Sequence, residues 1–183
     1  MDLELEQKIL LKRREIAEQI HTNIDFIINC FGYVKKQEFF EMLSNNCNVS
    51  KRKIRGWYTD MKLPNLSNTD ITKICSYLKI HFSDLISHPI DRSGIKNYEI
   101  PPFVPAELAK KNILNMLINR DIGNSQKFES FFEGNYTSNY FYVLQRKNKH
   151  QRNISWSFII TSAIYFEMSI GEFFINEDVD TND

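Results

Sequence analysis

Glycine and the sequence signals of tight β-turns are scarce in this chain of 183 residues. It contains only six glycines, and the pairs Asn-Gly and Asp-Gly, which favour two-residue hairpins, do not occur. Sustained alternation of apolar and polar residues, which is typical of half-buried strands, is also absent. Apolar residues instead recur at helical spacing along most of the chain, so the sequence predicts an all-α fold.

Long apolar runs are absent as well. A membrane-spanning helix needs about 20 consecutive apolar residues, and no segment approaches that length. The N-terminal stretch MDLELEQKILLKRRE is charged throughout and lacks the apolar region of a signal peptide. We therefore expect a cytoplasmic protein without a membrane partner.

Cysteine and histidine are few and widely spaced, which bears on disulfides, metals and catalysis. Cys30, Cys47 and Cys75 form no C-x-x-C pair, so we expect buried free thiols and no disulfide framework or zinc site. The four histidines have no companion at metal-ligand spacing. No glycine-rich phosphate loop and no catalytic triad or paired carboxylates stand out. The sequence therefore predicts no metal, no cofactor and no enzymatic activity.

Charge is balanced overall but unevenly distributed. The 23 basic and 23 acidic residues argue against a highly basic protein that coats nucleic acid nonspecifically. Between positions 33 and 62, however, seven Lys or Arg residues accompany only three acidic residues. Positions 137–153 hold four Lys or Arg residues and no acidic residue, while acidic residues collect near the two ends. Two local basic segments are thus candidates for contact with nucleic acid.

The N-terminal segment predicts two helices with a break between them. Residues 3–20 show amphipathic spacing, the polar run His-Thr-Asn at 21–23 predicts a break, and a short helix then ends at Gly32. The first of these helices is extra relative to one minimal domain. Packing within the same chain, a tie between two domains and dimerisation all remain open for it, because its seven-residue isoleucine spacing covers too few heptads to predict a coiled coil.

Two helices separated by a polar turn are predicted next. The first covers 36–44, and the cluster Asn-Asn-Cys-Asn at 45–48 predicts the turn. Ser50 is a candidate N-cap for the second helix, which extends to about position 60. Pro64 prevents its continuation. A further helix and a short turn that begins Ser-Asp-Leu-Ile complete this part of the chain.

Proline marks the boundary between two halves. Residues 88–105 hold four of the five prolines, so their composition predicts a semi-extended linker that spaces the halves apart. We expect a first domain over 1–87, a second helical domain over 106–176 and an acidic tail over 177–183. The second half repeats the predicted order of helices and the closing serine-led turn of the first half, at low identity. A tandem duplication and an unrelated second bundle are both consistent with this pattern.

The residues of the first half resemble a known family. The resemblance is carried by Gln37 in the short helix, Val49-Ser50 after the turn, the basic helix up to Trp57, Pro64, and the closing motif Ile80-x-x-Ser83-Asp84-Leu85-Ile86. This pattern resembles the lambda-repressor-like (Cro/C1 or XRE) helix-turn-helix family over residues 24–87, and more weakly over 107–175. The resemblance implies two small five-helix bundles joined by the proline-containing linker. It also implies that the third helix of each bundle is the one that enters the major groove of DNA.

Two departures from the family pattern are visible. Phe39-Phe40 is bulky where a small residue usually packs against the third helix, and the turn at 45–48 contains asparagine where the family usually has glycine. Asparagine tolerates the left-handed conformation that glycine would supply, so a turn at this place is compatible with the sequence.

The helix predicted over 50–60 separates apolar from cationic residues. Ile54, Trp57 and Tyr58 fall on one face, and most of the basic residues fall opposite. Arginine can pair bidentately with guanine, whereas lysine more often reaches phosphates. The predicted DNA-contacting residues are Gln37, Ser50, Lys51, Arg52, Lys53 and Arg55, with Lys35, Lys36 and Lys62 at the phosphates. Taken by itself, an ordinary solvated basic face explains the same pattern.

The matching helix of the second half has a different chemistry. It offers asparagine and tyrosine in place of a cationic face, and its positive charges follow it. Asparagine can read adenine, while exposed aromatic residues suit a protein interface. The candidates for this second DNA or partner surface are Asn139, Tyr140, Arg146, Lys147, Lys149 and Arg152.

Two functions follow from these observations. The first is a sequence-specific transcriptional regulator of the kind that phages and plasmids use, which binds double-stranded DNA and has one or two reading halves. The second is a protein-binding module on a helix-turn-helix scaffold, either an antirepressor or an inhibitor of a host defence complex, because a fold does not determine a function. A homodimer and a protein partner that binds through the second half are compatible with both.

Overall fold

The computed structural model describes residues 3–146 and 154–176, and these residues contain helices and no strand. The predicted all-α class is therefore confirmed. The elements are α1 (Leu3–Cys30), α2 (Lys36–Cys47), α3 (Lys51–Tyr58), α4 (Asp70–Leu78), α5 (Phe82–Ser87), the 3-10 turn η1 (Arg92–Gly94), α6 (Pro105–Asn119), α7 (Ser125–Phe131), α8 (Ser138–Gln145), α9 (Trp156–Phe166) and the 3-10 turn η2 (Ile170–Phe174). In the part of the chain that the structure describes, no helix is long and apolar enough to cross a membrane.

The first helix, α1, is continuous over 28 residues, so the predicted break at 21–23 is wrong. The reason is a tertiary contact of Asn23, whose side chain is buried in the middle of the helix. Its Nδ2 donates to the carbonyls of Leu85 and His88, each at 2.9 Å. Its Oδ1 accepts from the amide of Ile90 at 3.0 Å. Asn23 therefore ties α1 to the end of α5 instead of interrupting the helix.

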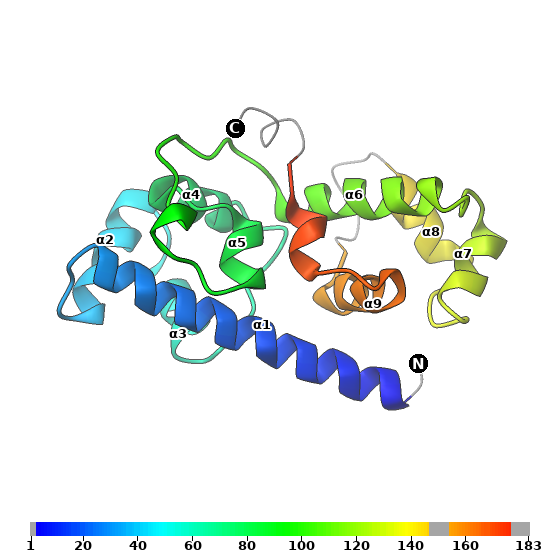
Figure 1. The fold of residues 1–183 in the computed structure, drawn as a ribbon, viewed down its shortest axis with the longest axis horizontal. Helices are drawn as coiled ribbons and strands as arrows, with labels where there is room; N and C mark the ends of the chain where they lie inside the picture. The colour runs from blue at the N-terminus through cyan, green and yellow to red at the C-terminus, as the bar shows by residue number, and fades with distance from the viewer. Residues whose placement is uncertain (1–2, 147–153, 177–183) are drawn as a thin grey trace.

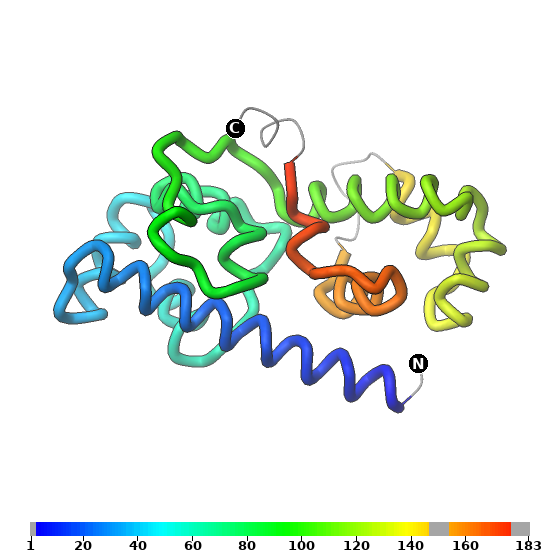
Figure 2. Tube along the Cα trace, viewed as in Figure 1, coloured from blue at the N-terminus to red at the C-terminus, as the bar shows by residue number. Residues whose placement is uncertain are grey.

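The first half packs α2, α3, α4 and α5 against the C-terminal part of α1. Both α3 and α5 contact α1, and α2 contacts both α3 and α4. Figure 1 shows these helices grouped at one end of the molecule, and Figure 2 shows α1 continuing from this group past α9. One hydrophobic core forms inside the group, and its fully buried members include Ile27, Phe39, Ile54, Ile71 and Ile80.

Residues 88–105 do not act as a free spacer, contrary to the expectation from their composition. Ile90 and Ile100 are buried, and the amide of Lys96 donates to the carbonyl of Lys79 at 2.7 Å. Proline content predicts an extended backbone, and extended backbone can still lie flat on a hydrophobic surface. This segment covers the first half while it leads to α6.

The second half is built on aromatic side chains. Its fully buried rings come from α7, α9, η2 and the ends of these elements, and they include Phe128, Phe132, Phe158, Phe166 and Phe173. Serine side chains lie at the starts of two of its elements. The side chain of Ser155 accepts from an amide of α9 at 3.2 Å, and Ser169 forms a capping box with Glu172 at the start of η2.

The two halves repeat details of hydrogen bonding and backbone conformation. Asn112 in α6 donates to two carbonyls at the end of η2, at 3.1 and 2.8 Å, as Asn23 in α1 does at the end of α5. The fourth helix of each half also ends in a left-handed residue. This residue is Lys79 after α4 and Glu167 after α9, each with φ of 56°.

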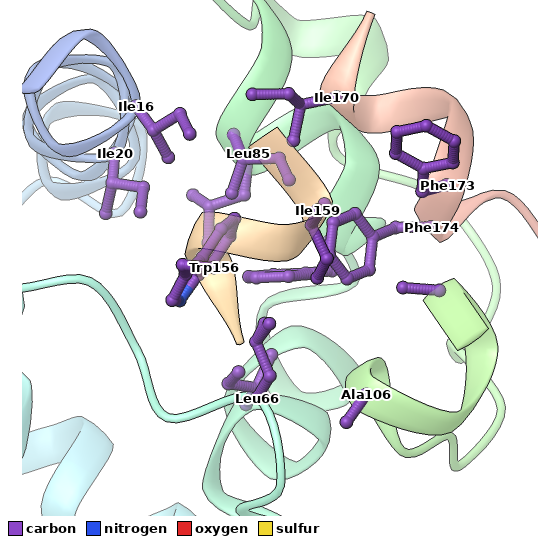
Figure 3. Packing of buried hydrophobic residues seen from close by; sticks show 14 of the residues in the cluster. Ile16, Ile20, Leu66, Leu85, Ala106, Trp156, Ile159, Ile170, Phe173 and Phe174 are labelled. Carbon is purple, nitrogen blue, oxygen red and sulfur yellow. The ribbon is translucent and has the colours of Figure 1, made fainter. Parts of the chain in front are cut away.

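The halves meet along α5 and η2 and share one hydrophobic core. The indole nitrogen of Trp156 donates to the carbonyl of Pro64 at 2.8 Å, which joins α9 to the segment before α4. Gly171 lies so close to Ser87 that a Cβ at this glycine would collide with the serine hydroxyl. Figure 3 shows side chains of α1, α5, α9 and η2 converging around Trp156. In Figure 1, α2 and α7 lie at opposite ends, on either side of this contact.

Candidate nucleic-acid interface

The candidate interface begins with the short connection between α2 and α3. The predicted turn at 45–48 is wrong for its first three residues, which form the last turn of α2. Cys47 is buried and Asn46 donates to the carbonyl of Met42 at 2.8 Å, and both interactions favour helix. Asn48 alone takes the left-handed conformation, with φ of 50°. Only positions 48–50 therefore connect the two helices, which gives a tighter unit than the sequence predicted.

Ser50 occupies the N-cap position of α3, as predicted, but its hydroxyl does not cap the helix. Its carbonyl accepts from the amides of Lys53 and Ile54, at 2.9 and 3.3 Å. The side chain is exposed, so the hydroxyl faces solvent at the start of α3. Gln37 in the first turn of α2 is exposed as well, so both residues offer hydrogen-bonding groups at a helix start.

The inner face of α3 is held firmly against the first half. Ile54, Trp57 and Tyr58 are buried, as their spacing predicts. The ring of Tyr58 stacks on His21 with a centroid distance of 4.2 Å, and its hydroxyl donates to Asp25 at 2.8 Å. These contacts fix the rotation of α3 about its own axis, so the opposite face must point to solvent.

That opposite face presents two arginines to solvent. Arg52 and Arg55 are exposed, and within residues 3–146 and 154–176 neither forms a salt bridge. They line a shallow hollow of about 310 Å³ together with Gly56, Thr59 and Asp60. A hydrogen bond from Lys62 is the main reason that the pKa of Asp60 lies below its usual range, and the charge of Arg55 contributes. The two guanidinium groups are therefore free to bind a ligand.

The neighbouring lysines of α3 are already engaged with carboxylates. Lys51 pairs with Glu41, and Lys53 pairs with Asp70 at 2.6 Å. The carboxylate of Asp70 is nearly buried, so its charge needs this partner. We conclude that Lys53 stabilises the start of α4. Its ion pair with Asp70 restricts the side chain of Lys53, whereas Arg52 has no such ion pair among the described residues.

The predicted phosphate-contacting lysines are also paired. Lys36 lies 2.7 Å from Asp25 and contacts the hydroxyl of Tyr58, while Lys62 lies 2.9 Å from Asp60. Lys35 is the most loosely held of the three, at 3.9 Å from Glu38. Since exposed pairs contribute at most about 1 kcal/mol each, Lys35 and Lys62 can exchange a carboxylate for a phosphate.

Two acidic residues on this surface were not apparent from the local sequence. Asp25 from α1 and Asp70 from α4 come from outside the basic window at 33–62, and each pairs with one of its lysines. The excess of positive charge on this surface is therefore lower by two than the window itself suggests. Only contacts between distant elements reveal these partners, so no local signal could have identified them.

The second predicted surface, on α8, is divided by the structure. Asn139 and Arg146 are exposed, whereas Tyr140 is half-buried with its ring centroid 4.4 Å from that of Phe158. Burial raises the pKa of the Tyr140 phenol. Tyr140 therefore belongs largely to the aromatic core, and its prediction as an exposed contact residue is wrong. The predicted residues Lys147, Lys149 and Arg152 lie outside the described residues.

A polar cleft of about 410 Å³ lies between α5 and η2. Its charged side chains include Asp84, Lys96 and Glu172. Lys96 lies 3.9 Å from Asp84, and Glu172 accepts from the amide of Ser169 at 2.9 Å. Among the described residues, no group of three His, Cys, Asp or Glu side chains is arranged to hold a metal. Each of these two contacts stays on one side of the cleft, because Asp84 and Lys96 both precede α6 whereas Ser169 and Glu172 both belong to the second half.

The buried thiols are not nucleophiles at neutral pH. Burial raises the pKa of Cys47 to about 11 and raises the pKa of Cys75 as well. Both side chains are therefore protonated near pH 7. A protonated thiol is unreactive, because the thiolate is the nucleophile. They pack as small apolar groups, as expected. Cys30 at the end of α1 is exposed, so the expectation of a buried thiol is wrong for this residue.

No protein-family model, no curated protein and no solved structure matches this chain. The resemblance to the lambda-repressor-like family therefore rests on the residues of the chain alone.

Proposed function

We propose that the chain is a sequence-specific DNA-binding transcriptional regulator of the lambda-repressor-like kind, and that α3 enters the major groove. The observation that carries this proposal is the division of α3 into a fixed inner face and an outer face with Arg52 and Arg55 free. An inserted helix needs this division, because its rotation must be set before its side chains can read base edges.

The start of α2 and the start of α3 support the same proposal. Gln37 and Ser50 are exposed there, and the side chain of Ser50 is not used to cap its own helix. Polar side chains and backbone amides at helix starts are typical phosphate contacts. The connection between α2 and α3 is only three residues long, which limits how far the starts of these two helices can move relative to each other.

The paired lysines predict how binding depends on salt. Lys51 and Lys62 would leave Glu41 and Asp60 to contact phosphates, and each phosphate contact adds roughly 0.9 to the slope of log affinity against log salt. Because these lysines must first give up a carboxylate, we expect their contribution to affinity to be smaller than that of the two arginines.

A mobility-shift titration on the DNA upstream of the protein's own coding sequence tests the proposal. Each arginine that pairs with guanine contributes about 1–3 kcal/mol of discrimination. We therefore expect Arg52→Ala with Arg55→Ala to weaken specific binding at least about tenfold. Arg92→Ala with Lys111→Ala, which removes two exposed charges elsewhere, is the matched control and should bind nearly as well as wild type. The proposal fails if wild type gives no retarded band at low salt, or if both double variants bind equally well.

A protein-binding role is the second candidate, and α8 is the observation that favours it. Tyr142 on this helix is 49% exposed, and aromatic residues are enriched at the centre of protein interfaces. Affinity capture with the full chain would then return one stoichiometric protein partner that Tyr142→Ala no longer binds. DNA binding would be absent in the mobility-shift titration.

A further inference from the structure

The N-terminal part of α1 has one exposed apolar face. Leu3, Leu10 and Leu11 are 70%, 66% and 61% exposed, although the other side of the same helix is buried at Leu5 and Ile9. The buried side belongs to the part of α1 that passes α9 (Figure 1). Leucine side chains gain about 1.5–3 kcal/mol each on full burial, so a face with three exposed leucines favours a partner.

This face leads into a groove on the first half. Leu3, Leu10 and Ala17 are seven residues apart and therefore lie on one side of the helix. At Ala17 this side meets the segment that follows α3, and a groove of about 650 Å³ opens there. Met61 and Leu63 give the groove apolar walls, and Met61 is 42% exposed. The leucine face and the groove thus form one continuous surface.

The charges along this surface change sign from one end to the other. Glu4 and Glu6 lie in the first turn of α1. The groove about two turns later is lined by Arg13, Arg14 and Lys62 against one acidic residue, Glu18, which pairs with Arg14 at 2.8 Å, so the charge of its lining is positive. A parallel copy of the helix would place like charges opposite each other, which is unfavourable. An antiparallel copy places the acidic turn of each helix opposite the basic positions of the other.

We propose that this surface binds the same surface of a second copy of the chain, with the two α1 helices antiparallel. Leu10 then lies against its own counterpart at the two-fold axis. Leu3 reaches the partner's groove near Ala17, and Glu6 lies beside the partner's Arg14. An interface of this kind is isologous, so one surface satisfies both copies. The dimer does not depend on the function of α3.

Sedimentation velocity on the full chain without DNA tests the dimer. We expect wild type to show a concentration-dependent shift from monomer to dimer, and Leu10→Arg to remain monomeric throughout. Ile118→Arg is the matched control, because Ile118 on α6 is 57% exposed and lies outside this surface, and it should dimerise like wild type. A wild-type chain that stays monomeric, or a Leu10→Arg chain that dimerises normally, would overturn the proposal.

A charge exchange tests the antiparallel arrangement independently. Glu6→Arg alone and Arg14→Glu alone should each weaken the dimer, because each places like charges opposite each other. The double variant restores the opposite charges and should recover most of the wild-type affinity. Failure of the double variant to recover would refute the antiparallel pairing, provided that circular dichroism shows all three variants to be folded.

Discussion

The helices α3 and α8 hold the third place in the helix order of their halves, yet they present different chemistry to solvent. The outer face of α3 carries Arg52 and Arg55, whereas the described part of α8 carries Asn139, Tyr142 and, at its end, Arg146. Their inner faces are similar, because both bury an apolar residue that fixes the helix on its own half. The buried side of each helix holds the helix on its own half, while the exposed sides of the two helices offer different chemical groups to solvent.

The largest expected effects concern the cores beneath these two helices. Ile54→Ala on the inner face of α3 should lower the free energy of unfolding by about 2–5 kcal/mol. Phe128→Ala, which removes the ring 5.3 Å from that of Phe141 on α8, should lower it by about 3–5 kcal/mol. Both residues are fully buried and the halves share one core, so we expect each variant to shift one common transition. Urea denaturation followed by circular dichroism and by tryptophan fluorescence measures this. Two separate transitions, of which each variant moves only one, would show that the halves unfold independently.

A smaller effect is expected at the two matched asparagines. Asn23 is fully buried and its side chain serves four backbone groups beyond α1, whereas Asn112 is half-buried and serves two. Asn23→Ala leaves buried carbonyls unsatisfied and should cost about 1–3 kcal/mol. Asn112→Ala should cost less, because water reaches its partners. Thermal denaturation of the two variants gives the order, and an equal or reversed order would contradict the argument from burial.

A still smaller effect is expected when the exposed face of α8 is changed in a DNA-binding measurement. Asn139→Ala with Arg146→Ala removes the two exposed polar candidates of the described second surface. We expect the slope of log affinity against log salt to fall by at most about 1, with the sequence preference unchanged. If this pair instead abolishes specific binding, both halves read bases and the contrast between α3 and α8 is wrong.

The smallest effect concerns alkaline pH. The first half buries Cys47, and burial raises the pKa of its thiol from 9.0 to about 11. The second half partly buries Tyr136 and Tyr140, and this raises the pKa of both phenols above 10.0. A raised pKa of an acid means that the folded state favours the neutral form. For the Cys47 thiol, the folded state keeps its full stability below pH 9, where the thiol is protonated in both states. As the pH rises from 9 towards 11, the thiol ionises in the unfolded chain first, and the free energy of unfolding falls. Denaturation at about pH 8 and about pH 10 should show a loss of stability that is smaller in Cys47→Ala than in wild type. An equal loss in the two chains would exclude the thiol as the cause.

Sequence reasoning succeeded where structure depends on neighbouring residues. Ser50 marks the start of α3, and Gly32 adopts the left-handed conformation soon after α1. The inner face of α3 also followed from spacing alone. Caps, chain reversals and amphipathic faces are local properties, and they are therefore readable in a single sequence.

Sequence reasoning failed where distant elements decide. Asn23 looked like a helix break, and only its contacts with the end of α5 explain why the helix continues. The lysines of the candidate interface looked free, and only the arrival of Asp25 and Asp70 from other helices shows that two of them are paired. Tyr140 was predicted to be exposed, and only its contact with Phe158 of α9 shows that its ring is half-buried.

The span of α1 has a consequence for the order in which the chain acquires its structure. Arg13 lies 3.5 Å from Ser157, a residue 144 positions later, and the buried Leu5 belongs to the same part of the helix that passes α9. Contacts between such distant positions form slowly, because the loop between them must close first. During synthesis, the C-terminal part of α1 can dock with α2–α5 early, while its N-terminal part waits for nearly the whole chain. We expect the start of α1 to gain protection from hydrogen exchange last, after the helices of both halves have formed.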